Sequence, residues 1–182
     1  MGELLNYALR LGLLCSLSGG LLGWVHSKTA PIKADREFQE REMAKREVFP
    51  LPKGGRFEDS SSSDPQYTYA IQSDGEVIGC VFTAKGPGYS SVLHIMVGMD
   101  RDGTLRGAKV LSQKETPGLG AKIKEMAPRW FSTGTLKDLA LSRSGGSIDA
   151  ISGATITSRA ALRAVRETGE KVKTLLEEET GP

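Results

Sequence analysis

The feature that most constrains this chain is an apolar segment near its N-terminus. No charged residue occurs in Leu11–Val25, and in the 22-residue stretch Leu4–Val25 the only charge is Arg10. As a helix this stretch is about 33 Å long, and the hydrocarbon core of a bilayer is about 30 Å thick. Arg10 lies near the end of the segment, so its side chain can reach the headgroups. We therefore predict a transmembrane anchor over residues 1–27.

A cleaved signal peptide and a lipidated cysteine are the alternatives for this segment. The segment Trp24–Lys28 contains no small-residue cleavage pattern, and Trp24 is typical of an interfacial anchor. Bulky Leu14 precedes Cys15 and disfavours lipid attachment there. We prefer the membrane span and keep the cleaved signal peptide as the alternative.

The charges beside the segment bear on orientation. Arg10 alone precedes it, whereas Lys28, Lys33, Arg36, Arg41 and Lys45 follow it. Positive-inside counting would therefore place the rest of the chain in the cytoplasm.

Composition excludes several classes of function. The 24 basic and 22 acidic residues give a net charge of +2, which disfavours general nucleic-acid binding. Cys15 and Cys80 form no C-x-x-C pair, which excludes cysteine-ligated iron–sulfur clusters, structural zinc and attached c-type haem. His26 and His94 stand alone, so a metal site or a Ser-His-Asp hydrolase is disfavoured. Any redox chemistry must use another cofactor.

The segment after the anchor is predicted to be a helical stalk and linker over residues 28–64. Acidic and basic residues alternate at helical spacing in 32–48, which is typical of a solvated helix. Prolines and glycines over 50–55 end this helix, and a polar loop follows over 60–65.

Residues 65–182 are predicted to form one α+β domain, with an antiparallel sheet and a C-terminal helix. Apolar alternation and an Asp74–Gly75 turn indicate a meander of strands. The predicted strands are 67–71, 77–82, 93–99 and 105–111, the predicted helices are 122–126 and 157–178, and Pro128 marks the end of the first helix.

Two segments carry the candidate chemistry. The segment Asp149–Ser158 is rich in small and hydroxyl residues and runs directly into the predicted C-terminal helix. A helix start attracts anions through its unpaired N–H groups and dipole; an ordinary helix start capped by Thr157 or Ser158 is the alternative. The segment Glu115–Lys122 combines proline and glycine in a loop that could enclose a flat ligand, or serve only as a strand-to-helix connection.

Together these segments resemble a known family. The pattern D-x-x-S-G-A-T over Asp149–Thr155 resembles the covalent flavinylation motif of FMN-binding domains in the G subunit of Rnf complexes and the C subunit of the sodium-pumping NADH:quinone reductase. The run E-T-P-G-L-G-x-K-I over Glu115–Ile123 resembles the flavin-contacting loop of that family, and Gly86–Tyr89 resembles its G-x-G-Y turn. The short chain looks more like the Rnf subunit.

The resemblance implies specific roles for residues. A flavin transferase would join the phosphate of FMN to the hydroxyl of Thr155, and Asp149 would serve recognition by that transferase. The implied cofactor-binding residues are Ser152, Gly153, Ala154, Ile156, Thr157 and Ser158 around the attachment point, and Glu115, Thr116, Gly118, Leu119 and Lys122 along the flavin. Tyr89, Trp130 or Phe131 could stack on the ring or belong to the core.

The implied function is that of an electron relay rather than a complete enzyme, because the chain shows neither a nicotinamide-binding motif nor an acid–base pair. The resemblance implies a covalent-FMN subunit of a membrane complex that couples ferredoxin:NAD oxidoreduction to ion transport. In that family the domain lies on the outer face of the membrane, and we follow the resemblance against the charge count. The alternatives are a quinone-reductase subunit, a flavin domain that serves a different reductase, and a non-redox single-span scaffold.

Overall fold

The structure is a computed structural model that describes residues 2–62, 65–132 and 134–180. The chain forms two compact units, Met1–Glu42 and Met43–Pro182. In the predicted polar loop, Ser63 and Asp64 lie outside the described residues.

The first unit belongs to one long helix, α1 (Gly2–Val48). Its N-terminal part is long and apolar enough to cross a membrane, with a mean hydropathy of 1.5 over its most apolar window and no buried side chains there. The helix continues through Pro31, so the predicted anchor and stalk form a single element.

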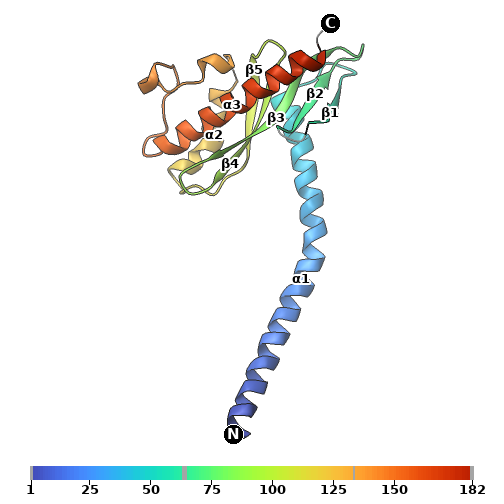
Figure 1. Cartoon of the computed structure of the whole chain (residues 1–182), viewed down its shortest axis with the longest axis vertical. Coiled ribbons are helices and arrows are strands. Elements are labelled where there is room, and N and C mark those ends of the chain that lie inside the picture. Colours follow the sequence, from blue (N-terminus) through green and yellow to red (C-terminus); the bar gives the residue numbers. More distant parts are fainter. Residues whose placement is uncertain (1, 63–64, 133, 181–182) are drawn as a thin grey trace. The chain divides into compact units, whose positions relative to one another are not determined.

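The second unit is built on a five-stranded antiparallel sheet (Figure 1). Its strands follow one another in chain order, each paired with the next. They are β1 (Arg56–Asp59), β2 (Tyr67–Ile71), β3 (Val77–Pro87), β4 (Val92–Asp100) and β5 (Leu105–Ser112). The predicted antiparallel sheet and α+β class are confirmed.

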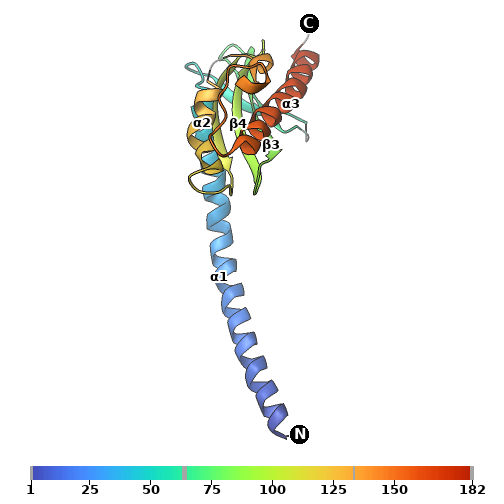
Figure 2. The same ribbon diagram turned by 90° about the vertical axis from the view of Figure 1, so that its left-hand side faces the viewer.

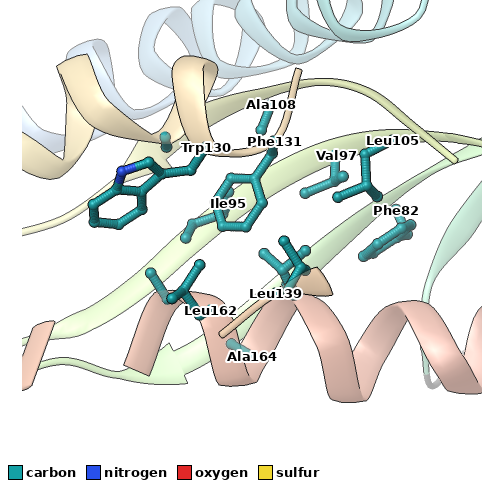
Figure 3. Packing of buried hydrophobic residues seen from close by; sticks show 14 of the residues in the cluster. Phe82, Ile95, Val97, Leu105, Ala108, Trp130, Phe131, Leu139, Leu162 and Ala164 are labelled. Atoms are coloured by element: carbon teal, nitrogen blue, oxygen red, sulfur yellow. The ribbon is translucent and has the colours of Figure 1, made fainter. Parts of the chain in front are cut away.

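Helices cover one face of this sheet. The covering helices are α2 (Ile123–Trp130) and α3 (Thr155–Thr180), and the short helices η1 (Gly120–Lys122), η2 (Leu136–Asp138) and η3 (Ser142–Ser144) belong to the connecting segments. Figure 2 shows α3 beside β3 and β4. Because α3 turns an apolar stripe inward, its Leu162 closes the main core together with Phe82 and Ile95 (Figure 3). Leu162 is almost fully buried, and Val165 of the same stripe is fully buried.

The opposite face of the sheet is covered by the last turn of α1. Ala44, Val48 and Phe49 form a second core with Val81 and Met96. Central strands are therefore buried on both faces, which explains their nearly continuous apolar runs.

The domain therefore extends further toward the N-terminus than sequence reasoning places it. The segment 28–64 is predicted to be stalk and linker, yet residues 43–49 pack on the sheet and β1 pairs with β2. Residues 43–48 were assigned to the stalk because charged residues dominate their sequence pattern. Strand β1 was not predicted because it is a four-residue edge strand in which Phe57 is the one apolar residue.

Two helix ends also differ from prediction. Pro128 lies inside α2 instead of ending it. The helix runs two residues further because Ala127 and Trp130 are buried against the sheet. The C-terminal helix begins at Thr155 rather than at residue 157, so Thr157 and Ser158 belong to its first turn and are not caps.

Candidate functional site

The two segments singled out by sequence meet at the start of α3. They line a cavity of about 480 Å³, a size typical of small-molecule and cofactor sites. The lining residues are Tyr89, Glu115, Thr116, Leu119, Gly120, Gly153, Ala154, Thr155, Ile156 and Thr157. A single site therefore draws on the β3–β4 turn, the loop after β5 and the first turn of α3.

A tight turn delivers the chain into α3. The N–H of Ala154 donates to the carbonyl of Ile151 at 2.9 Å, and Gly153 has a φ of +74° at the third position of this turn. That combination is typical of a type II turn, which requires a positive φ there. A Cβ on Gly153 would also lie 2.9 Å from Leu119 Cδ2, so a larger residue here would have to displace the Leu119 side chain.

Ser158 holds the same turn from inside. Its hydroxyl accepts a hydrogen bond from the N–H of Ile151 at 3.0 Å and donates to the carbonyl of Ala154 at 3.0 Å. The side chain is fully buried and does not line the cavity. Ser158 therefore supports the site from behind.

Thr155 is the first residue of α3 and lines the cavity with a partly exposed side chain. The first turn of α3 contains no acidic residue, and the N–H groups of a first helical turn lack partners within the helix. The site at Thr155 therefore combines a partly exposed, cavity-lining residue with the positive end of a helix dipole.

Glu115 is the most highly connected polar group of the site. Its side chain is 6% exposed, and its Oε2 accepts a hydrogen bond from the Thr157 hydroxyl at 2.7 Å. Its two oxygens also accept from the β3–β4 turn: from the N–H groups of Tyr89, Ser90 and Ser91 at 3.2, 3.0 and 2.9 Å, and from the Ser91 hydroxyl at 3.0 Å. Burial opposes ionisation of Glu115, but these hydrogen bonds outweigh it and hold its pKa below the ordinary value.

Large apolar side chains surround the cavity and remain exposed. Tyr89 is 71% exposed, Ile156 56% and Leu119 43%. All three line the cavity, one from each of its three segments. Such a surface can bury the apolar part of a flat ligand.

The remaining predicted residues lie outside the cavity lining. Ser152 and Gly118 are exposed in their turns, Gly118 with a φ of +76°, and Lys122 is exposed in η1. Asp149 is also exposed and accepts a hydrogen bond from the Ser142 hydroxyl at 2.8 Å.

Sequence reasoning missed part of the site and left its aromatic residues undecided. Trp130 and Phe131 pack edge to face in the core, and Phe131 is fully buried, so Tyr89 is the aromatic residue at the cavity. Ser90 and Ser91 were not predicted, since their role depends on contacts with a residue 24 or 25 positions away. Gly120 lies within the recognised loop pattern, which is the signal that could have identified it.

The comparisons with known proteins agree with this geometry. Residues 88–170 match the family model described as an FMN-binding domain, a range that contains the whole cavity lining. By fold and site, the chain is a protein with this type of domain.

Relatives define the family more closely. The G subunit of the ion-translocating oxidoreductase complex of Pseudomonas aeruginosa is 31% identical over 187 residues, which cover 91% of this chain and 86% of the relative. The chain belongs to the family formed by the G subunits of ion-translocating oxidoreductase complexes, as its motifs predicted.

Other matches are more partial. The corresponding protein of Pseudoalteromonas atlantica is 36% identical over 59% of this chain and 54% of its own length. The chain thus spans about half the length of that relative and of the one from Vibrio vulnificus. The crystal structure of Shewanella oneidensis NqrC is 18% identical, with a TM-score of 0.48 over 72% of this chain and 74% of that chain.

Proposed function

We propose that this chain is an electron-carrier subunit of a membrane-bound, ion-translocating oxidoreductase complex of the Rnf type, with FMN attached covalently to Thr155. The observation that carries the proposal is that Thr155 faces a cavity of about 480 Å³ at the start of a helix, within the matched FMN-binding domain. The partners would be the other membrane subunits of the complex, and a flavin transferase during maturation.

The residues present fit FMN. The exposed apolar residues Tyr89, Leu119 and Ile156 offer surface to a flat ring system, and the start of α3 suits a phosphodiester that keeps one negative charge. Glu115, Thr116, Gly153 and Thr157 would complete the enclosure. When bound, FMN supplies one- and two-electron chemistry, while the chain binds and orients it.

Attachment is a phosphoryl transfer. The hydroxyl oxygen of Thr155 would form a bond to the phosphorus of an activated flavin donor, in which the phosphate of FMN is joined to a leaving group by a pyrophosphate bond. That pyrophosphate bond breaks, the leaving group departs with its phosphate, and the hydroxyl proton is released. The exposed Asp149 would be part of the surface that the transferase recognises.

The neighbouring hydroxyls are less suited to attachment. Ser152 is exposed but does not line the cavity. Thr157 is 1% exposed and donates to Glu115, and the fully buried Ser158 donates to the Ala154 carbonyl. Thr155 lines the cavity and takes part in neither of these hydrogen bonds. This difference supports Thr155 as the attachment residue.

The experiment is coexpression of the chain with its flavin transferase, followed by denaturing electrophoresis and in-gel flavin fluorescence. Thr155→Val should abolish covalent fluorescence without loss of expression, because the substitution removes one partly exposed hydroxyl. Thr155→Ser keeps a hydroxyl and is the matched control. Fluorescence that persists in Thr155→Val would refute attachment at this residue.

A further inference from the structure

The carboxylate of Glu115 joins three parts of the chain that are far apart in sequence. Besides its own loop, it binds the β3–β4 turn 24 to 26 residues earlier and the first turn of α3 42 residues later. Each of these three segments supplies lining residues to the cavity. One side chain therefore links all the walls of the proposed flavin site.

The surrounding backbone is shaped to accommodate this carboxylate. A Cβ on Gly88 would lie 2.6 Å from Glu115 Oε1, and a Cβ on Gly120 would lie 2.8 Å from Oε2. Both distances are shorter than real Cβ contacts allow. The two glycines thus leave the space that the buried carboxylate fills.

The carboxylate is the appropriate group for this position, because an ionised carboxylate only accepts hydrogen bonds and each of its two oxygens can accept more than one. Its partners are all donors: three backbone N–H groups and the hydroxyls of Ser91 and Thr157. An amide in its place would present an NH₂ group to some of these donors and leave them without a partner.

From these contacts we infer that Glu115 is the positioning residue of the site: by accepting hydrogen bonds from the β3–β4 turn and from Thr157, it holds the start of α3 so that Thr155 faces the cavity. This inference rests on the proposed function in one respect, namely that Thr155 is positioned to receive FMN. The positioning by Glu115 can be measured in the chain without flavin.

The first measurement is hydrogen–deuterium exchange of the full-length chain without flavin. Glu115→Gln should speed amide exchange in the turn 88–91 and at Ile151, Ala154 and Ser158, whose N–H groups are hydrogen-bonded around the start of α3, while the rest of α3 stays protected. Glu125→Gln removes the same charge from an exposed position of α2 and should leave both segments unchanged. Thr157→Val should speed exchange at Ile151, Ala154 and Ser158, and Thr157→Ser should leave exchange there slow because it retains the hydroxyl.

The second measurement is the rate of FMN incorporation by the transferase, followed by intact mass. Glu115→Gln should slow incorporation by roughly tenfold or more, the factor expected when charged hydrogen bonds are lost, with Thr155 still the attachment point. The double variant Glu115→Gln, Thr157→Val should be no slower than Glu115→Gln alone. Both changes act on the same hydrogen bond between residues 115 and 157, so their effects should not add.

If amide exchange in Glu115→Gln equalled that of the original chain, the positioning role would be overturned. The role would also be overturned if exchange became faster while the rate of FMN incorporation stayed the same. If the original chain itself acquired no FMN, the proposed function would fail, and the exchange data would still decide whether Glu115 holds the three segments.

Discussion

At the residue scale, the site distinguishes two threonines that are two positions apart. The side chain of Thr155 faces the cavity, whereas Thr157 is buried and bound to Glu115. Because side chains two residues apart on a helix point in different directions, this difference follows directly from the start of α3 at Thr155. Under the proposal, the attachment hydroxyl of Thr155 and the supporting hydroxyl of Thr157 thus belong to a single helical turn.

Gly153 provides a test at this scale. Gly153→Ala should lower the free energy of unfolding by about 1–2 kcal/mol, the cost of a left-handed conformation for a residue with a Cβ, and should also displace Leu119, 2.9 Å from the new Cβ. Gly145→Ala is the matched control, since its φ is +84° but nothing lies within 4 Å.

Chemical denaturation of the detergent-solubilised chain measures the stability of both variants, and transferase assays measure their flavin incorporation. Both should lose similar stability, and only Gly153→Ala should incorporate flavin poorly. Equal incorporation by the two variants would show that the contact between the turn and Leu119 is unimportant for the site.

At the scale of elements, the sheet is packed by the last turn of α1 on one face and by α3 on the other. The carbonyl of Val48 lies 2.3 Å from where a Cβ on Gly98 would be, and 3.1 Å from one on Gly107. The end of α1 thus sits directly on the backbone of β4 and β5. Lys109 and Glu47 form an ion pair at the same junction.

These distances predict a graded effect. Gly98→Ala should destabilise the domain by about 1–3 kcal/mol, as overpacking of a tight contact does, and Gly107→Ala should cost less because its contact is longer. Chemical denaturation of the full chain is the measurement. Equal stabilities of Gly98→Ala and the original chain would mean that the end of α1 does not pack closely on the sheet in solution.

How far the elements could be predicted follows from their sequence patterns. Strands β2 to β5 were predictable, because β-branched and aromatic residues in them are separated by turn residues such as Asp74–Gly75. The role of residues 43–49 was not, because a helical turn with mixed charges outside and three apolar residues inside resembles a solvated stalk. Likewise, Glu115 was recognised within a loop pattern, but partners that are 24 to 42 residues distant cannot be inferred from spacing.

At the scale of the whole molecule, the proposal combines a membrane anchor with a redox domain. The anchor would keep the flavin site at a membrane surface, and the covalent bond would prevent loss of the cofactor. We propose that the domain lies on the extracytoplasmic side, as the family resemblance implies, although the basic residues after the span favour the opposite arrangement under the positive-inside rule.

An introduced cysteine tests this orientation. Ser61 is exposed in the described loop, and Cys80 is fully buried with a raised thiol pKa, so its background labelling should be low. In a Cys15→Ser background, Ser61→Cys should react with a membrane-impermeant maleimide added to spheroplasts. Labelling that occurs only in inverted membrane vesicles would place the domain in the cytoplasm.

The most direct test of the central claim is peptide mass spectrometry of the protein purified from its own membranes in an active complex. Cleavage after Arg143 and Arg159 releases one peptide, 144–159, that contains Thr155 and the neighbouring hydroxyl residues. We predict that this peptide carries the added mass of an FMN phosphodiester and that fragment ions locate it on Thr155. An unmodified peptide 144–159 from a fully active complex would contradict the account.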